Sequence, residues 1–186
     1  MELRGLGIDG VFEVVPKKLV DARGYFAETY SKEFFRTAGI TQEWVQDNQS
    51  YSVDAGVLRG LHFQVAPFAQ DKLIRVLRGS IFDVAVDLRK CSPTFGQSVS
   101  CIISATNFNQ VFVPRGFAHG FVTLEPNSEV FYKVSAPYAP SCDRTISHSD
   151  PALGIEWPKP APEFTLSDKD RRAPLLSDII ADIAFD

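Results

Sequence analysis

Short runs of β-branched and aromatic residues, separated by Gly, Pro, Asn, Asp and Ser, dominate the chain and predict an all-β protein. The two clearest runs flank Arg78-Gly79, which predicts a tight hairpin with Gly79 at positive φ. No alternation of strands with helices appears, so the ten short strands favour a sandwich or barrel. The expected strands are residues 11–15, 25–30, 44–53, 57–64, 72–77, 80–88, 99–104, 110–113, 116–124 and 130–134.

Two segments have helical patterns instead. Ser31 can N-cap a short helix over residues 32–38, which Gly39 would end. After Pro174, apolar residues recur at helical spacing and predict an amphipathic C-terminal helix over residues 174–184. The sequence has no internal repeat and no change of composition that would mark a second domain. We therefore expect one domain over residues 1–186 with a few short peripheral helices.

Composition narrows the classes of partner. The 19 Lys and Arg against 23 Asp and Glu give a net charge of −4, which argues against nucleic acid as a partner. No apolar run approaches the roughly 20 residues of a membrane-spanning helix, and the first residues lack the apolar core of a secretion signal. Cys91, Cys101 and Cys142 stand without Cys-x-x-Cys spacing, which argues against a disulfide framework. We expect a cytoplasmic protein that does not contact a membrane.

The most informative stretch is residues 57–64, where an expected strand carries Arg59, His62 and Gln64. Polar groups in a buried strand need partners. Strand alternation puts His62 and Gln64 on one face and Arg59 on the other, unless a bulge at Gly60 turns Arg59 round. The sequence leaves both arrangements open, and a satisfied surface histidine is the alternative to a functional one.

Polar side chains interrupt other expected strands. Lys72 opens one strand and Tyr132 lies in the last, while His119 starts a strand after a Pro-Arg-Gly turn and Asp83 is a candidate to hold its ring. Each could be an ordinary strand residue with one hydrogen bond. Together, a histidine with a carboxylate, a lysine aimed at a carbonyl oxygen and a tyrosine hydroxyl form a set for proton transfer at carbon acids.

An anion pocket and a capping motif complete the set of candidates. Guanidinium groups suit phosphate oxygens, and the cationic or ionisable candidates for such a pocket are Arg23, Arg59, Lys72 and His119. Ser167-x-x-Asp170, taken alone, matches a helix capping motif with Asp170 in the first turn.

A metal site is disfavoured. The chain has three histidines, His62, His119 and His148, so a three-histidine site would use all of them. Gln64 also stands where a His-x-His pair would have its second imidazole. We therefore expect no metal and no cofactor.

Ten motifs in order carry a specific resemblance over residues 2–176. They include Asp21-x-Arg23-Gly24-x-Phe26-x-Glu28, Gln46-Asp47-Asn48-x-Ser50, residues 56–64, Gln70-x-Lys72-Leu73, residues 82–89 with 92–96, Val113-Pro114-x-Gly116 continuing to Phe121, Tyr132-Lys133, Tyr138-x-Pro140, Asp150-Pro151 with Ile155-x-Trp157-Pro158, and Leu166-Ser167-x-Lys169-Asp170. In these motifs the chain resembles the dTDP-4-dehydrorhamnose 3,5-epimerases. It departs from many members at Asp143, Thr145 and His148.

The resemblance implies a metal-free, cupin-like antiparallel jelly roll that works as a homodimer. It also implies a nucleotide-sugar epimerase that inverts C3 and C5 of dTDP-4-dehydro-6-deoxy-D-glucose to give dTDP-4-dehydro-L-rhamnose. We expect exposed strand edges to be covered in the dimer, with the N-terminal strand over residues 11–15 pairing across the interface.

The resemblance also assigns roles to residues. His62 would be the base, Asp170 would orient it, and Tyr132 would return a proton at C5. Lys72 would stabilise the enolate oxygen. The implied substrate-binding residues are Arg23, Phe26, Glu28, Gln46, Asn48, Arg59, Lys72, His119 and Tyr138. Of these, the two arginines would meet the diphosphate and Tyr138 would lie near the nucleotide.

Four alternatives remain open at this point. The closest in chemistry is a 3- or 5-monoepimerase of deoxysugar biosynthesis, which retains the same proton-transfer residues. A nucleotide-sugar ketoisomerase would also exchange protons but would move the carbonyl. A metal-dependent cupin oxygenase and a noncatalytic sugar-binding jelly roll are the less favoured alternatives.

Overall fold

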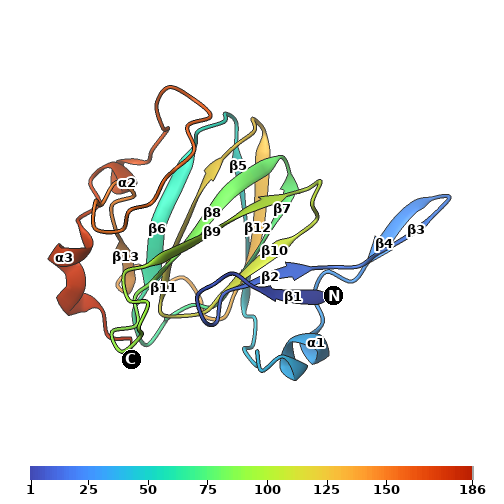
Figure 1. Ribbon diagram of the computed structural model, residues 1–186, viewed down its shortest axis with the longest axis horizontal. Coiled ribbons are helices and arrows are strands. Elements are labelled where there is room, and N and C mark those ends of the chain that lie inside the picture. The colour runs from blue at the N-terminus through green and yellow to red at the C-terminus, as the bar shows by residue number, and fades with distance from the viewer. Residues whose placement is uncertain (186) are drawn as a thin grey trace.

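Two antiparallel β-sheets packed face to face form the body of the molecule in the computed structural model, which describes residues 1–185 (Figure 1). The six-stranded sheet has the order β1 (Glu2–Gly5), β2 (Phe12–Val15), β10 (Gln110–Val113), β7 (Lys72–Arg78), β12 (Ser128–Val134) and β5 (Gln46–Ser52). The five-stranded sheet has the order β13 (Asp143–Thr145), β6 (Leu58–Gln64), β11 (Phe117–Thr123), β8 (Ser80–Asp87) and β9 (Ser98–Ser104). The predicted all-β jelly roll is confirmed.

Alternation along the strands builds the core between the sheets. In β7, Ile74 and Val76 are buried and face the other sheet, where they pack with Ile81 of β8. Arg75, between the two buried residues, points to the outer face. Burying each large aliphatic side chain contributes roughly 1.5–3 kcal/mol, so this alternation fixes which side of β7 faces inward.

Short helices cover parts of the outer faces, as expected. Helix α1 (Lys32–Thr37) packs Phe35 against Leu73 and Phe112 on the six-stranded sheet. The C-terminal segment packs Leu176 and Ile183 on the five-stranded sheet. These contacts make both segments peripheral supports of the sandwich.

Two predicted local signals hold. Ser31 caps α1, with its hydroxyl accepting a hydrogen bond from the Phe34 backbone N–H, and Gly39 follows the helix with φ +81°. Gly79 joins β7 to β8 with φ +76°, which side chains rarely adopt. An added Cβ at Gly79 would also lie 2.3 Å from the Ser128 hydroxyl, so the hairpin requires glycine.

The C-terminal helix predicted over residues 174–184 is wrong in extent. The structure has α3 (Leu176–Ile179), one turn long, followed by a 3-10 turn, η1 (Ile180–Asp182). The apolar spacing instead serves an irregular segment that buries Leu176 and Ile183, while Ile180 stays exposed. A second short helix, α2 (Asp168–Arg171), precedes it.

Strands β1, β3 (Lys18–Asp21) and β13 were not predicted. In β1, Glu2 and Arg4 alternate with Leu3 and Gly5, and β13 lies within a segment rich in Pro and Ser. Strand β3 pairs with β4 (Gly24–Ala27) in a separate two-stranded sheet. The pairing expected for residues 11–15 is also wrong, because β2 is hydrogen-bonded on both sides within the chain, to β1 and β10.

The β3–β4 hairpin projects from the sandwich, away from the C-terminal helices (Figure 1). Its Leu19, Val20 and Phe26 are exposed. Among residues 1–185, no helix is long and apolar enough to cross a membrane.

Candidate active site

A bulge in β6 turns Arg59 and His62 to the same side. In the pairing of β6 with β11, His62 faces His119 and Arg59 faces Phe121, so β6 has one extra residue between them. Gly60, within the bulge, has φ +132°, and an added Cβ would lie 2.5 Å from the Cα of Gly120. Of the two arrangements that the sequence left open, the bulged one is therefore present.

Two adjoining cavities share His62, Lys72 and Tyr132. The Arg59 cavity, of about 290 Å³, is also lined by Arg59, His119, Ser167 and Asp170, with Ser50 and Phe121. The Tyr138 cavity, of about 420 Å³, is also lined by Gln46, Asn48, Gln64, Gln70, Tyr138, Asp143 and Lys169, with Phe63. All four predicted catalytic residues therefore lie where the two cavities meet or in the Arg59 cavity.

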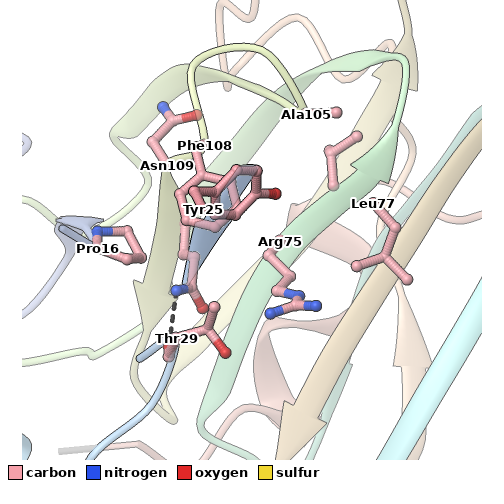
Figure 2. Close-up of a pocket in the computed structure, with 10 residues that line it drawn as sticks. Pro16, Tyr25, Thr29, Arg75, Leu77, Ala105, Phe108 and Asn109 are labelled. Atoms are coloured by element: carbon pink, nitrogen blue, oxygen red, sulfur yellow. Dashed lines mark hydrogen bonds between the residues drawn. The ribbon is translucent and has the colours of Figure 1, made fainter. Parts of the chain in front are cut away.

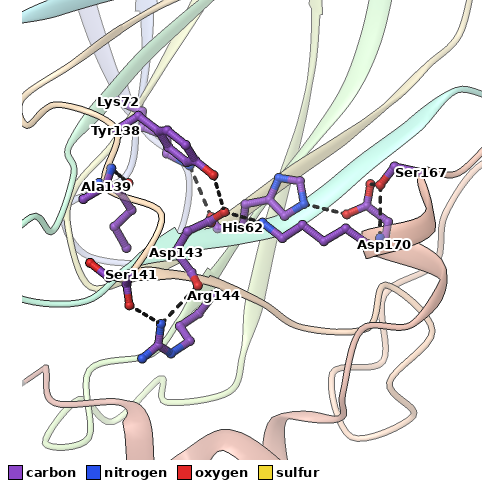
Figure 3. Close-up of polar contacts among 11 residues, drawn as sticks. His62, Lys72, Tyr138, Ala139, Ser141, Asp143, Arg144, Ser167 and Asp170 are labelled. Carbon is purple, nitrogen blue, oxygen red and sulfur yellow. Dashed lines mark hydrogen bonds and ion pairs between the residues drawn. The ribbon is translucent and has the colours of Figure 1, made fainter.

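His62 is paired with a buried carboxylate. Its Nε2 lies 2.5 Å from Asp170 Oδ1, and the Ser167 hydroxyl donates to Asp170 Oδ2 at 2.8 Å (Figure 3). The Ser167 hydroxyl also accepts from the Asp170 backbone N–H, so Asp170 belongs to the cap of α2 as well. The contacts that the capping interpretation and the orienting interpretation of Asp170 require are both present.

The environment keeps Asp170 ionised. Burial is the largest influence and opposes the charge, but hydrogen bonds from His62 and Ser167 and the nearby charges of His62 and Lys169 outweigh it. The net effect lowers the pKa of Asp170. An ionised Asp170 can stabilise a protonated His62 ring.

Lys72 brings a buried amine to the shared part of the cavities. It is the first residue of β7, and its Nζ donates to the His62 carbonyl oxygen at 3.2 Å. Burial lowers the pKa of Lys72 to about 8, against the opposing pull of Asp83 and Asp143. The ammonium is therefore the main form at neutral pH.

Tyr132 stands on the wall opposite His62, because β12 belongs to the six-stranded sheet and β6 to the five-stranded one. Its neighbours across the strands are Asn48 and Ile74. Burial raises the pKa of Tyr132, and the positive charge of Arg59 only partly offsets this. The phenol is consequently protonated at neutral pH.

A second buried pair of histidine and carboxylate lines the Arg59 cavity. His119 Nε2 lies 2.7 Å from Asp83 Oδ2, and both residues are buried. The contact suggested by the sequence is present, and it fixes the ring of His119 beside the shared residues.

Polar residues without a predicted role also line the Tyr138 cavity. Asp143 accepts hydrogen bonds from the Tyr138 hydroxyl at 3.1 Å and from Lys169 Nζ at 2.5 Å (Figure 3). Lys169 precedes Asp170 in a motif of the sequence, and this neighbourhood was the signal that could have marked Lys169 as a site residue. Asp143 lies on β13, which the sequence did not predict.

The predicted substrate residues Arg23, Phe26 and Glu28 do not line either cavity. They lie on or just after the β3–β4 hairpin, where the Arg23 side chain is 90% exposed and pairs with Asp21. Phe26 is 71% exposed. A single chain does not bring these residues to the other candidates.

A separate cavity of about 160 Å³ lies where this hairpin meets the outer face of the six-stranded sheet (Figure 2). Tyr25, Arg75 and Phe108 line it, and Lys18 lies over the rings of Tyr25 and Phe108. None of the predicted catalytic residues contributes to it. Within residues 1–185, no group of three or more His, Cys, Asp and Glu side chains is arranged to hold a metal ion.

Comparisons with known proteins agree with the sequence resemblance. The family model described as dTDP-4-dehydrorhamnose 3,5-epimerase matches residues 5–178. The enzyme of that name from Salmonella typhimurium is 50% identical over 171 residues, which cover 91% of this chain and 92% of the relative.

Solved structures are also similar. The dTDP-4-dehydrorhamnose 3,5-epimerase from Bacillus anthracis, with TDP and PPi bound, is 48% identical with a TM-score of 0.90, covering 94% of this chain and 99% of the other. A dTDP-6-deoxy-D-glucose-3,5-epimerase from Legionella pneumophila, in complex with dTDP-4-keto-L-rhamnose, is 43% identical with a TM-score of 0.93, covering 99% and 97%. The predicted cupin-like fold and epimerase class are confirmed, and the chain belongs to the dTDP-4-dehydrorhamnose 3,5-epimerase family of isomerases.

Proposed function

We propose that the protein inverts C3 and C5 of dTDP-4-dehydro-6-deoxy-D-glucose, giving dTDP-4-dehydro-L-rhamnose. The reaction takes place where the two cavities meet, with His62 as the base. The contact of His62 with buried Asp170, open to a cavity that also contains Lys72 and Tyr132, carries this proposal. A sugar ring between the sheets would expose one face to His62 and the other to Tyr132.

Each inversion requires one proton to leave and one to return. Neutral His62 takes the proton from the carbon next to the keto group, and the electrons of the C–H bond move onto the carbonyl oxygen. The Lys72 ammonium stabilises this enolate oxygen, and Asp170 stabilises the imidazolium. The enolate then collapses as its carbon takes a proton on the opposite face. No electrons are gained or lost, so the reaction requires no redox cofactor.

Tyr132 supplies the proton on the opposite face at C5. Its raised pKa keeps it a donor at neutral pH, and its place on the other sheet supports delivery from the other side. A monoepimerase would need only one such delivery. A protonated Tyr132 therefore supplies the donor that inversion at C5 requires.

The remaining candidates bind the nucleotide diphosphate. Arg59 donates to the Tyr51 carbonyl and the Ser52 hydroxyl, which leaves further N–H groups of its guanidinium for a phosphate. Tyr138 offers an exposed ring to the nucleotide, and Gln46 and Asn48 line the same cavity.

Two chains act together in this proposal. The exposed apolar residues of the β3–β4 hairpin favour docking on a second copy, because an unpartnered apolar arm is unfavourable in water. An exchanged hairpin would bring Arg23, Phe26 and Glu28 to the partner's cavities, where Arg23 would meet the diphosphate. The homodimer then completes two equivalent sites.

We place this single-domain enzyme in the cytoplasm. Cys91, Cys101 and Cys142 are unpaired in the structure, which suits a reducing compartment.

Product analysis tests the proposed function. Purified protein is incubated with dTDP-4-dehydro-6-deoxy-D-glucose, and NMR coupling constants report the configuration at C3 and C5. We expect the doubly inverted sugar. A product inverted at C3 or C5 alone would establish the monoepimerase, a 3-keto sugar would establish the ketoisomerase, and unchanged substrate would reject all three enzymes.

A further inference from the structure

Gln64 holds two neighbouring loops by all three of its hydrogen bonds. Its Nε2 donates to the carbonyl oxygens of Phe68 at 2.7 Å and Pro137 at 3.1 Å, and its Oε1 accepts from the Ala139 backbone N–H at 2.7 Å. Both amide hydrogens are used, and the side chain is buried. Gln64 lies in a motif of the chain but has no amide hydrogen left for a substrate.

Two other glutamines bind the same loop from other elements. Gln70 Nε2 donates to the Ala136 carbonyl at 2.8 Å, and Gln46 Oε1 accepts from the Tyr138 backbone N–H at 3.2 Å. Residues 136–139 belong to no helix or strand. Side-chain amides therefore bind the backbone of this loop at four successive residues. They take the place of the backbone hydrogen bonds that a neighbouring strand would supply in a sheet.

This loop contributes Tyr138 to the lining of the Tyr138 cavity. Tyr138 is 58% exposed, and its hydroxyl donates to Asp143, so the ring is fixed at both its backbone and its hydroxyl end. Figure 3 shows the ring standing over Asp143 on the side away from Asp170. A ring fixed before binding loses little conformational entropy when a flat base stacks on it.

We propose that Gln64 and Gln70 are positioning residues that preform the Tyr138 loop, and that they set the affinity for the nucleotide rather than the rate of proton transfer. The inference rests on the proposed function, because it takes Tyr138 as the contact of the nucleotide end. The inference goes beyond that function because it assigns a role to Gln64 and Gln70, which do not touch the reacting carbons.

The test measures dTDP binding and turnover separately. Gln64→Met keeps the length of the side chain but removes three hydrogen bonds, and Gln70→Met removes one. We expect the Kd for dTDP to rise about tenfold or more in Gln64→Met and by less in Gln70→Met, while kcat at saturating sugar nucleotide stays within about threefold. Gln97→Met, at an exposed position, is the matched control.

A double-mutant cycle shows whether Gln64 acts through Tyr138. In a Tyr138→Ala background, adding Gln64→Met should change the Kd for dTDP by less than about twofold. The inference is overturned if Gln64→Met and Gln70→Met bind dTDP as the wild type does. It is also overturned if kcat falls while Kd holds, or if the Gln64→Met effect persists in full without Tyr138. Wild-type protein that does not bind dTDP would instead reject the proposed function, and this inference with it.

Discussion

His62 Nε2 and Asp170 Oδ1 lie 2.5 Å apart and join β6 to α2 across 108 residues of sequence. The same carboxylate is held by the Ser167 hydroxyl at the start of α2. Because the cap of α2 fixes Asp170, the orientation of the proposed base depends on a helix of one turn. Capping and catalysis can therefore be separated only by variants that remove one and keep the other.

Asp170→Asn removes the charge that stabilises the imidazolium. We expect kcat to fall by about 100-fold or more, since an amide leaves the ring without its ionic partner. Ser167→Ala is the matched control, because it removes the cap but keeps the carboxylate, and it should cost about 0.5–2 kcal/mol of unfolding free energy with a much smaller loss of rate. Turnover and denaturant unfolding measured on both variants check this. Equal rates in Asp170→Asn and wild type would leave Asp170 with the capping role alone.

Tyr132→Phe removes the phenol and keeps the ring. Inversion at C5 should be lost, while His62 still exchanges protons, so NMR in D₂O should show labelled substrate without the doubly inverted product. Full conversion by Tyr132→Phe would mean that solvent, or another group, returns the proton.

Loss of the positive charge of Lys72 predicts a fall in activity at alkaline pH. The amine is charged below its pKa of about 8 and neutral above it, so stabilisation of the enolate is lost as pH rises through that value. We expect kcat/KM, whose pH profile reports the free enzyme, to decline with a midpoint near pH 8. In Lys72→Arg the guanidinium keeps its charge, so the decline should disappear although the overall rate is lower. An unchanged decline in Lys72→Arg would assign it to another group.

Hairpin exchange predicts complementation between two defective chains. His62→Asn lacks the base but has an intact hairpin, and Arg23→Ala has the base but a defective hairpin. If hairpins are exchanged, a mixed dimer contains one site with both intact residues, so mixing after mild dissociation should give more activity than the sum of the separate proteins. Activity equal to the sum, or light scattering that shows only monomer, would contradict the exchanged dimer.

Alternation of apolar residues was enough to predict the body of the sandwich. Ile74 and Val76 of β7 face the core as their spacing requires, and the turn at Gly79 follows from its flanking strands. The C-terminal helix could not be predicted in extent, because the same apolar spacing also suits one helical turn followed by a 3-10 turn that buries Ile183.

The sequence motifs predicted part of the lining of the two cavities, including His62, Lys72 and Tyr132, but not its geometry. Whether Arg59 and His62 lie on the same side of the sheet depends on the bulge in β6. That bulge depends in turn on the close approach of Gly60 to Gly120, which the sequence alone does not show. The role of Gln64 depends on the Pro137 carbonyl and the Ala139 backbone N–H, both more than 70 residues later in the chain, which no local pattern contains. Long-range hydrogen bonds to irregular backbone are thus the part that sequence periodicity does not encode.

Deuterium incorporation tests most directly the claim that His62 is the base. Wild-type protein and His62→Asn, with matched circular dichroism spectra, are incubated with dTDP-4-dehydro-6-deoxy-D-glucose in D₂O, and NMR follows the signals of C3 and C5. The wild type should label both carbons and His62→Asn neither. Labelling by His62→Asn within a few-fold of the wild-type rate would contradict the account.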